Sequence, residues 1–93
     1  VFVEPSQLQK GWDRDRIIKE INALGVPCNL GSCPEVYLEK AFNGTGFKPK
    51  KRLPNSKKLG ETSIIFLVHP TLTEDEIQQT CDAIKSIMDL AVI

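Results

Sequence analysis

The sequence lacks an excess of charge of either sign. Twelve basic and twelve acidic residues cancel, so the formal net charge of the 93 residues is zero. A chain without net charge creates no long-range field that would steer nucleic acid or an anionic membrane towards it. We therefore expect neither nucleic acid nor a membrane among its partners.

Cysteine and long apolar runs are also scarce. The three cysteines, Cys28, Cys33 and Cys81, are an odd number at spacings that suggest no disulfide framework, which favours a reducing compartment over secretion. No apolar stretch approaches the roughly 20 residues of a membrane span. No basic-then-apolar leader opens the sequence. We expect a cytoplasmic protein, and the length suffices for one small domain covering residues 1–93.

The clearest local pattern is a strand followed by a helix near the end of the sequence. Ser63–Val68 is rich in β-branched and apolar residues, as strands are, and Pro70 ends this run. Thr73 with Glu76 three residues later forms a capping box, which predicts a helix from Thr73 to about Leu90. Its apolar face is predicted to contain Ile77, Cys81, Ile84 and Met88, with Ile87 beside them, so Cys81 is expected in the core.

A second amphipathic helix is predicted near the beginning. Asp13 can cap it, and Gly25 supplies a left-handed stop. Two strands are predicted at Val1–Val3 and at Val26–Leu30, the latter weakened by Pro27. The remaining pieces are a short helix at 36–42, a loop at 43–54 and a turn of helix at 55–60. This order predicts a two-layer α+β domain, with a three- to four-stranded mainly antiparallel sheet packed against two long helices.

Three segments carry a resemblance to a known family. They are RDRIIKEINALGV, YLEKAF and IIFLVHPTLTEDEIQQTCDAI, and they follow one another with turns and a variable loop between them. In this order they resemble the C-terminal small domain of the DegT/DnrJ/EryC1/StrS family, the pyridoxal-phosphate-dependent sugar aminotransferases of aspartate-aminotransferase fold type I. The similarity extends from about Trp12 to Met88.

The resemblance implies a longer enzyme that transfers an amino group, usually from glutamate, to a keto group of a nucleotide-linked sugar in the synthesis of polysaccharides or surface glycans. In that family the lysine that binds pyridoxal phosphate covalently lies in the large domain. We therefore expect no catalytic and no cofactor-binding residue in this chain, and an inactive fragment. The implied partners are the chain's own large domain, a homodimer partner, the nucleotide-sugar and the amino donor.

The turn after Val26 is where the family places residues close to the bound sugar. This sequence departs from the family's usual aromatic, proline and histidine residues there. Ser32, Glu35 and Tyr37 could form hydrogen bonds to a sugar, and we name them as candidate substrate-lining residues. The alternative is that Ser32 and Glu35 are solvated turn residues and that Tyr37 packs against a helix.

Two other sets of residues have a functional and a structural interpretation. His69 could be a general base, but no nucleophile is placed beside it by spacing, so support of the turn is the preferred interpretation. The three cysteines with His69 lack the short paired spacings of zinc sites, and no metal is expected. Half of the twelve basic residues lie between Lys48 and Lys58, in a loop that is either solvated or contacts a diphosphate.

The first residues suggest a fragment. Val1–Val3 begins a strand pattern without a methionine, and we expect a longer native polypeptide before Val1. The competing hypothesis is a free-standing α+β ligand-binding or regulatory module, which predicts a complete sheet and a pocket of its own.

Overall fold

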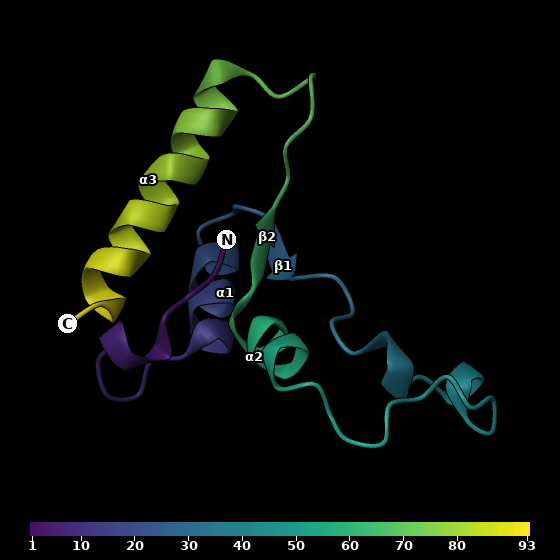
Figure 1. The fold of residues 1–93 in the computed structure, drawn as a ribbon. Coiled ribbons are helices and arrows are strands. Elements are labelled where there is room, and N and C mark those ends of the chain that lie inside the picture. The colour runs from purple at the N-terminus through teal and green to yellow at the C-terminus, as the bar shows by residue number, and fades with distance from the viewer.

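The computed structural model describes all 93 residues and has three α-helices and one two-stranded sheet (Figure 1). In chain order the elements are α1 (Arg14–Ala23), β1 (Cys28–Leu30), α2 (Pro54–Thr62), β2 (Ile64–Phe66) and α3 (Glu74–Ala91). Single 3-10 turns lie at Pro5–Gln7, Val36–Leu38 and Lys40–Phe42. The α+β class is confirmed. None of the helices combines the length and apolar character that crossing a bilayer requires.

The helix ends lie where local chemistry predicts them. The Asp13 carboxylate accepts the Arg16 N–H at 2.7 Å at the start of α1, and Gly25 follows its end with a φ of +83°. At the start of α3 the Thr73 hydroxyl accepts the Glu76 N–H, while the Glu76 carboxylate accepts the Thr73 N–H at 2.7 Å. The capping box is therefore confirmed on both sides.

The sheet has fewer strands than predicted, and the helices differ in length from the prediction. Only β1 and β2 form a ladder, antiparallel with Asn29 opposite Ile65, so the prediction of three to four strands is wrong in number. Residues 1–3 run beside β2 and join it through an isolated bridge between Phe2 and Ser63, with backbone hydrogen bonds on either side of it. The predicted turn at 55–60 is a full nine-residue helix, and Pro54 occupies its first turn, where the missing N–H costs nothing. Of the two helices predicted to be long, α3 has 18 residues and α1 has ten.

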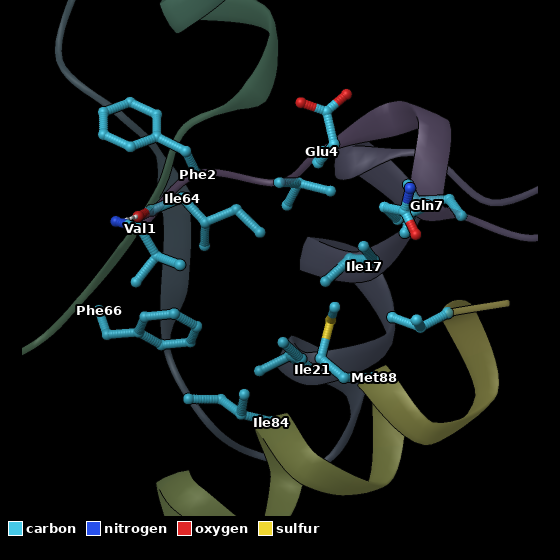
Figure 2. Close-up of a pocket in the computed structure, with 13 residues that line it drawn as sticks. Val1, Phe2, Glu4, Gln7, Ile17, Ile21, Ile64, Phe66, Ile84 and Met88 are labelled. Carbon is cyan, nitrogen blue, oxygen red and sulfur yellow. Dashed lines mark hydrogen bonds between the residues drawn. The ribbon is translucent and has the colours of Figure 1, made fainter.

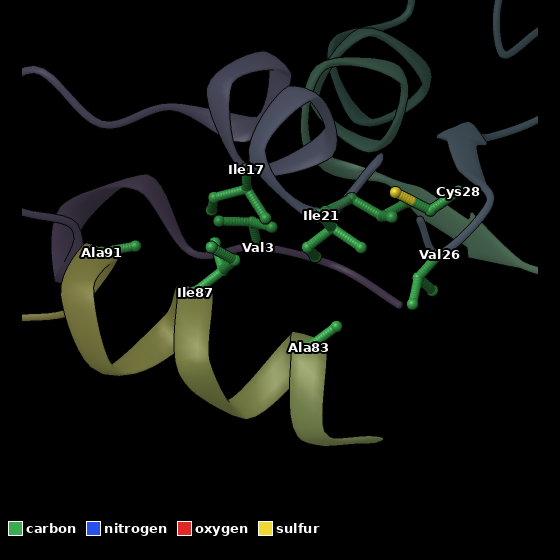
Figure 3. Close-up of a cluster of buried hydrophobic side chains, with 9 residues drawn as sticks. Val3, Ile17, Ile21, Val26, Cys28, Ala83, Ile87 and Ala91 are labelled. Carbon is green, nitrogen blue, oxygen red and sulfur yellow. The ribbon is translucent and has the colours of Figure 1, made fainter. Parts of the chain in front are cut away.

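A small apolar core lies between α1, the inner face of the sheet and α3 (Figure 3). Its nine members are Val3, Ile17, Ile21, Val26, Cys28, Ile64, Ala83, Ile87 and Ala91. The small side chains of Ala83 and Ala91 flank Ile87 on the face of α3 that meets α1, which lets the two helices approach closely.

The prediction that Cys81 is a core residue is wrong. Cys81 is exposed, and Ile77 on the same stripe is 50% exposed. The N-terminal half of α3 extends past the other elements, so its apolar residues have nothing in this chain to pack against (Figure 1). Ile84 and Met88, further along α3, are only partly buried at the edge of the core.

The two ends of the domain are tied together. The Gln9 N–H donates to the Ala91 carbonyl at 2.8 Å, and the Ile93 N–H donates to the Gln7 carbonyl at 3.0 Å. These bonds flank a bridge between Leu8 and Val92.

The chain is unusually open for its length. Its radius of gyration is 16.3 Å, whereas a compact domain of this size has about 12 Å. Its accessible surface is 7066 Å², against about 5,400 Å² expected for a folded monomer of this mass. The excursion between β1 and α2 reaches away from the core and accounts visibly for part of this difference (Figure 1). Much apolar surface therefore stays exposed, including Phe2, Leu67, Val68 and Phe47.

Candidate functional site

A groove of about 320 Å³ lies on the outer face of the sheet, opposite the core. The turn after β1 forms one wall, and α2 with the N-terminal segment forms the others. Its walls combine apolar and hydroxyl side chains, among them Phe2, Leu59, Ile65, Ser32, Ser56 and Ser63. Such a mixture suits a ligand with apolar faces and several hydroxyl groups.

Two glycines allow the walls of this groove to come together. A Cβ on Gly31 would lie 2.2 Å from the Ser63 Oγ, and a Cβ on Gly60 would lie 2.2 Å from the Pro34 Cγ. Both distances are far below van der Waals contact, so a Cβ at either position would force its neighbour to move. The turn thereby rests directly on α2 and on the start of β2.

The excursion after this turn is closed by a cluster of three side chains, which we call the Glu35 clasp: Glu35, Tyr37 and Arg52. Arg52 donates from Nε and Nη2 to the two carboxylate oxygens of Glu35, at 2.9 and 2.5 Å. The Tyr37 hydroxyl donates to Glu35 Oε2 at 2.7 Å and accepts the Leu53 N–H at 2.8 Å. The clasp thus fixes the beginning of the excursion to its end, across the intervening loop.

Electrostatics in the clasp favour the ionised carboxylate. The hydrogen bonds from Arg52, and then the one from Tyr37, lower the pKa of Glu35 from its ordinary value of 4.5 to about 2. The same pairing raises the pKa of Arg52. Because the Glu35 side chain is 11% exposed and its carboxylate accepts three hydrogen bonds, its oxygens are already occupied by protein groups.

The three predicted substrate-lining residues are therefore separated. Ser32 lies on the wall of the groove, whereas Glu35 and Tyr37 belong to the clasp and do not line the groove. Neither Glu35 as a solvated residue nor Tyr37 as a residue packed on a helix describes this arrangement. Sequence reasoning missed Arg52 as their partner, because 17 positions separate it from Glu35 and it lies within a run of basic residues.

The basic residues from Lys48 to Lys58 are all exposed, and some of them also have partners within the chain. Besides Arg52, Lys48 donates to the Asn43 side chain at 3.2 Å, and Lys57 lies 3.9 Å from Glu61 one turn along α2. Lys50 and Lys51 are exposed and take part in no ion pair. The interpretation of this loop as a diphosphate contact stays a prediction.

His69 supports the turn between β2 and α3. Its Nδ1 accepts the Thr71 N–H at 3.2 Å and lies 2.8 Å from the Thr71 hydroxyl. Because the backbone N–H can only donate, Nδ1 is the acceptor in this contact. This geometry agrees with a supporting role for the ring.

A metal site and a site for covalently bound pyridoxal phosphate each require particular side chains in particular surroundings. No three His, Cys, Asp or Glu side chains lie together as metal ligands would. Every lysine is exposed, and none lines the groove or the apolar cavity beneath the N-terminal segment. A lysine that forms a covalent bond to pyridoxal phosphate needs a desolvated position in a pocket. The residues present do not form a pyridoxal-phosphate site by themselves.

Comparison with solved structures finds a close relative. An aminotransferase from Psychrobacter cryohalolentis, solved by X-ray crystallography, superposes with a TM-score of 0.90 and is 62% identical over 95% of this chain. The chain is homologous to part of an aminotransferase. The matching part is the C-terminal part of that aminotransferase, and this chain spans 22% of its length. No family model matches the sequence, and the comparison with curated proteins gives no match.

The open fold leaves apolar side chains uncovered. The relative is several times longer than this chain, which spans 22% of its length. Exposed apolar residues such as Ile77 and Val68 are typical of a surface that another domain covers.

Proposed function

We propose that these 93 residues are the C-terminal small domain of a pyridoxal-phosphate-dependent aminotransferase that transfers an amino group, from glutamate, to a keto group of a nucleotide-linked sugar. The observation that supports this proposal most is the 62% identity to an aminotransferase, together with a TM-score of 0.90 over 95% of the chain. The sugar substrate is supported by the segments Arg14–Val26 and Ile64–Ile84, through their resemblance to the sugar aminotransferases.

In this proposal the domain forms part of the wall of the substrate site and provides no catalytic residue. The cofactor supplies the electron sink for amino transfer when it is bound, and the lysine that holds it lies in the large domain. The small domain offers the outer sheet face, whose groove contains Ser32, as part of the wall of the substrate site. The Glu35 clasp has a positioning role, because it sets where the excursion with Lys50 and Lys51 lies.

The alternative of a free-standing module has less support. It predicts a complete sheet, but the sheet has two strands and a single bridge to the N-terminal segment. The fragment hypothesis instead predicts an exposed apolar surface, and only ten of the 93 residues are buried. Large and homodimer-partner domains that cover the apolar surface fit the openness better.

The test uses the full-length parent enzyme, supplied with pyridoxal phosphate, glutamate and a panel of nucleotide-linked keto sugars. We expect 2-oxoglutarate to form only when a keto sugar is present, and the amino sugar to appear in equal amount. Release of 2-oxoglutarate with 2-oxo acids but with none of the keto sugars would overturn the sugar substrate. No turnover with any acceptor, in a protein that binds no pyridoxal phosphate, would overturn the aminotransferase itself.

Ser32 can be tested in the same assay. Replacing Ser32 by Ala in the parent should raise KM for the nucleotide-sugar while leaving KM for glutamate unchanged, because the hydroxyl lies on the groove wall. Ser6, an exposed serine outside the groove, provides the matched control as Ser6→Ala. Equal KM values in both variants and the parent would remove Ser32 from the substrate site.

A further inference from the structure

The N-terminal segment is already paired with β2 in a defined antiparallel register. Val1 and Ile64 exchange two hydrogen bonds, at 2.8 and 2.9 Å, and the Val3 N–H donates to the Thr62 carbonyl at 2.8 Å. Phe2 lies opposite Ser63 between these pairs. In an antiparallel ladder, hydrogen-bonded and non-hydrogen-bonded pairs alternate, and these three pairs follow that rule.

This register leaves one edge of β2 open beyond Val1. Because successive residues of a strand direct their N–H and C=O groups to opposite sides, those of Ile64 and Phe66 both point to the side of Val1. Ile65 points to β1 instead, opposite Asn29. The ladder on the Val1 side ends at Val1, while the chain of β2 runs on as an extended ribbon past the N-terminus (Figure 1). Leu67 and Val68 on this extension are 54% and 89% exposed.

An apolar cavity opens beside the same edge. It has a volume of about 160 Å³, and eleven of its thirteen lining residues are hydrophobic. Figure 2 shows Val1 and Phe66, from the two paired segments, on one side of this cavity, and Ile21 and Met88 on the other. The side chains that line an apolar cavity open to water lack burial and dispersion contacts on that side, so an apolar group that fills the cavity stabilises the fold.

We propose that this edge and cavity bind an extended strand formed by the residues that precede Val1 in the parent polypeptide. The inference rests on the proposed function, which places a large domain upstream. In the observed register the second residue before Val1 lies opposite Phe66 and exchanges two backbone hydrogen bonds with it. Its side chain shares the face of Val1 and Phe66, enters the cavity and is apolar. The third residue before Val1 lies opposite Leu67, as a non-hydrogen-bonded pair.

Continuity favours this occupant over a separate chain. The register is already set by Val1, Phe2 and Val3, so the upstream residues reach the open edge of β2 without a turn or a linker. A strand from another molecule would need to form all its pairs at the cost of association. The relative is also much longer than this chain, which spans 22% of its length. A parent of similar length would contain upstream residues that can pair with the open edge of β2.

The test is a pair of cysteines in the full-length parent. One replaces Leu67, and the other replaces the third residue before Val1. Directly opposite residues in a non-hydrogen-bonded pair have Cα atoms about 4.5 Å apart, within the range that a disulfide spans. We expect mild oxidation to yield this disulfide in most molecules, detected by mass spectrometry of the linked peptides. The matched control places the first cysteine at Val68, on the opposite face of the strand, and should form no such link. Equal yields from the two pairs, or none from Leu67→Cys, would overturn the register.

A second measurement needs no substitution. In the unmodified parent the Phe66 amide should exchange its hydrogen slowly, since it donates to the upstream strand. Fast exchange at Phe66, alongside slow exchange at its neighbour Ile65, would overturn the proposal even if the cysteine variants failed to fold. Both measurements report on pairing and not on turnover, so their outcome is independent of which substrate the enzyme accepts.

Discussion

Asn22 pairs with the backbone of Cys28 in the way a neighbouring strand would. Its side-chain Nδ2 donates to the Cys28 carbonyl at 2.9 Å, and its Oδ1 accepts the Cys28 N–H at 3.1 Å. The amide thereby satisfies both backbone groups at the free edge of β1 and joins this edge to the end of α1. An edge strand with open N–H and C=O groups is a site of unwanted association, and this amide closes part of it.

Replacing Asn22 by Ala should destabilise the chain by about 2 kcal/mol, since two hydrogen bonds worth roughly 1 kcal/mol each are lost. Asn22→Asp should not recover this loss, because it keeps an acceptor for the Cys28 N–H but turns its second carboxylate oxygen towards the Cys28 carbonyl, which is also an acceptor. The free energy of unfolding from urea titration measures both effects. Asn55, an exposed residue of α2, gives the control Asn55→Ala. An unchanged free energy of unfolding in Asn22→Ala would contradict this prediction, because it would show that water replaces the amide at the edge of β1 without loss of stability.

The Glu35 clasp should make stability depend on pH in acid. The pKa of Glu35 is lowered from 4.5 to about 2 in the folded chain, so the folded state favours the ionised form. The resulting stabilisation is fully present above pH 4.5 and is lost as the pH falls towards 2. We expect Glu35→Gln to remove this part of the acid dependence of the unfolding midpoint. Glu39→Gln, at a nearby exposed carboxylate, should leave it in place. Identical acid profiles for the parent chain and Glu35→Gln would contradict the lowered pKa.

Gly31→Ala should destabilise the chain by about 1 to 3 kcal/mol, the usual cost of forcing an extra methyl group into a packed contact. The new Cβ would lie 2.2 Å from the Ser63 Oγ and 2.9 Å from the Ser63 Cβ. Because both atoms belong to one side chain, the double variant Gly31→Ala/Ser63→Gly should recover much of the loss. Thermal unfolding of the parent chain and of the two variants measures this. If the double variant is no more stable than Gly31→Ala, contact with the Ser63 side chain is not the cause of the destabilisation.

Thiol labelling should separate the cysteines. Cys28 is 2% exposed, and burial raises the pKa of its thiol, whereas Cys33 and Cys81 are exposed. Since the thiolate is the reactive form, Cys28 should react with a maleimide only as the chain unfolds. Mass spectrometry over time should show two fast additions and one slow addition. Replacing Cys28 by Ser should abolish the slow phase alone, and a fast third addition in the folded chain would place Cys28 at the surface.

Local chemistry made parts of this fold predictable. The Thr73–Glu76 capping box and the Gly25 stop depend on neighbours within one helical turn, so the sequence pattern suffices to locate them. The face of α3 could not be located in this way. Its apolar residues form two overlapping stripes, and only contact with α1 determines that Ala83, Ile87 and Ala91 point inward while Cys81 does not.

The segment that forms a wall of the groove was predictable, but the contacts of its residues were not, and their role as substrate-lining residues stays a prediction. The turn after β1 does form the wall of a groove, and Ser32 lies on it. Arg52 reaches Glu35 only because the excursion folds back on itself, and no sequence pattern near Glu35 predicts this fold-back. Long-range pairing of this kind depends on loop geometry, which local propensity does not describe.

The bridge between Leu8 and Val92 has a consequence for synthesis. The segment at Gln7–Gln9 is made early, but its partner at Ala91–Ile93 emerges from the ribosome last among these residues. Leu8 therefore stays unpaired until Val92 has been made, whereas Val1–Val3 can pair with β2 as soon as that strand is complete. The bridge is a long-range contact that forms only after the local bonds of α1 and β2 are possible.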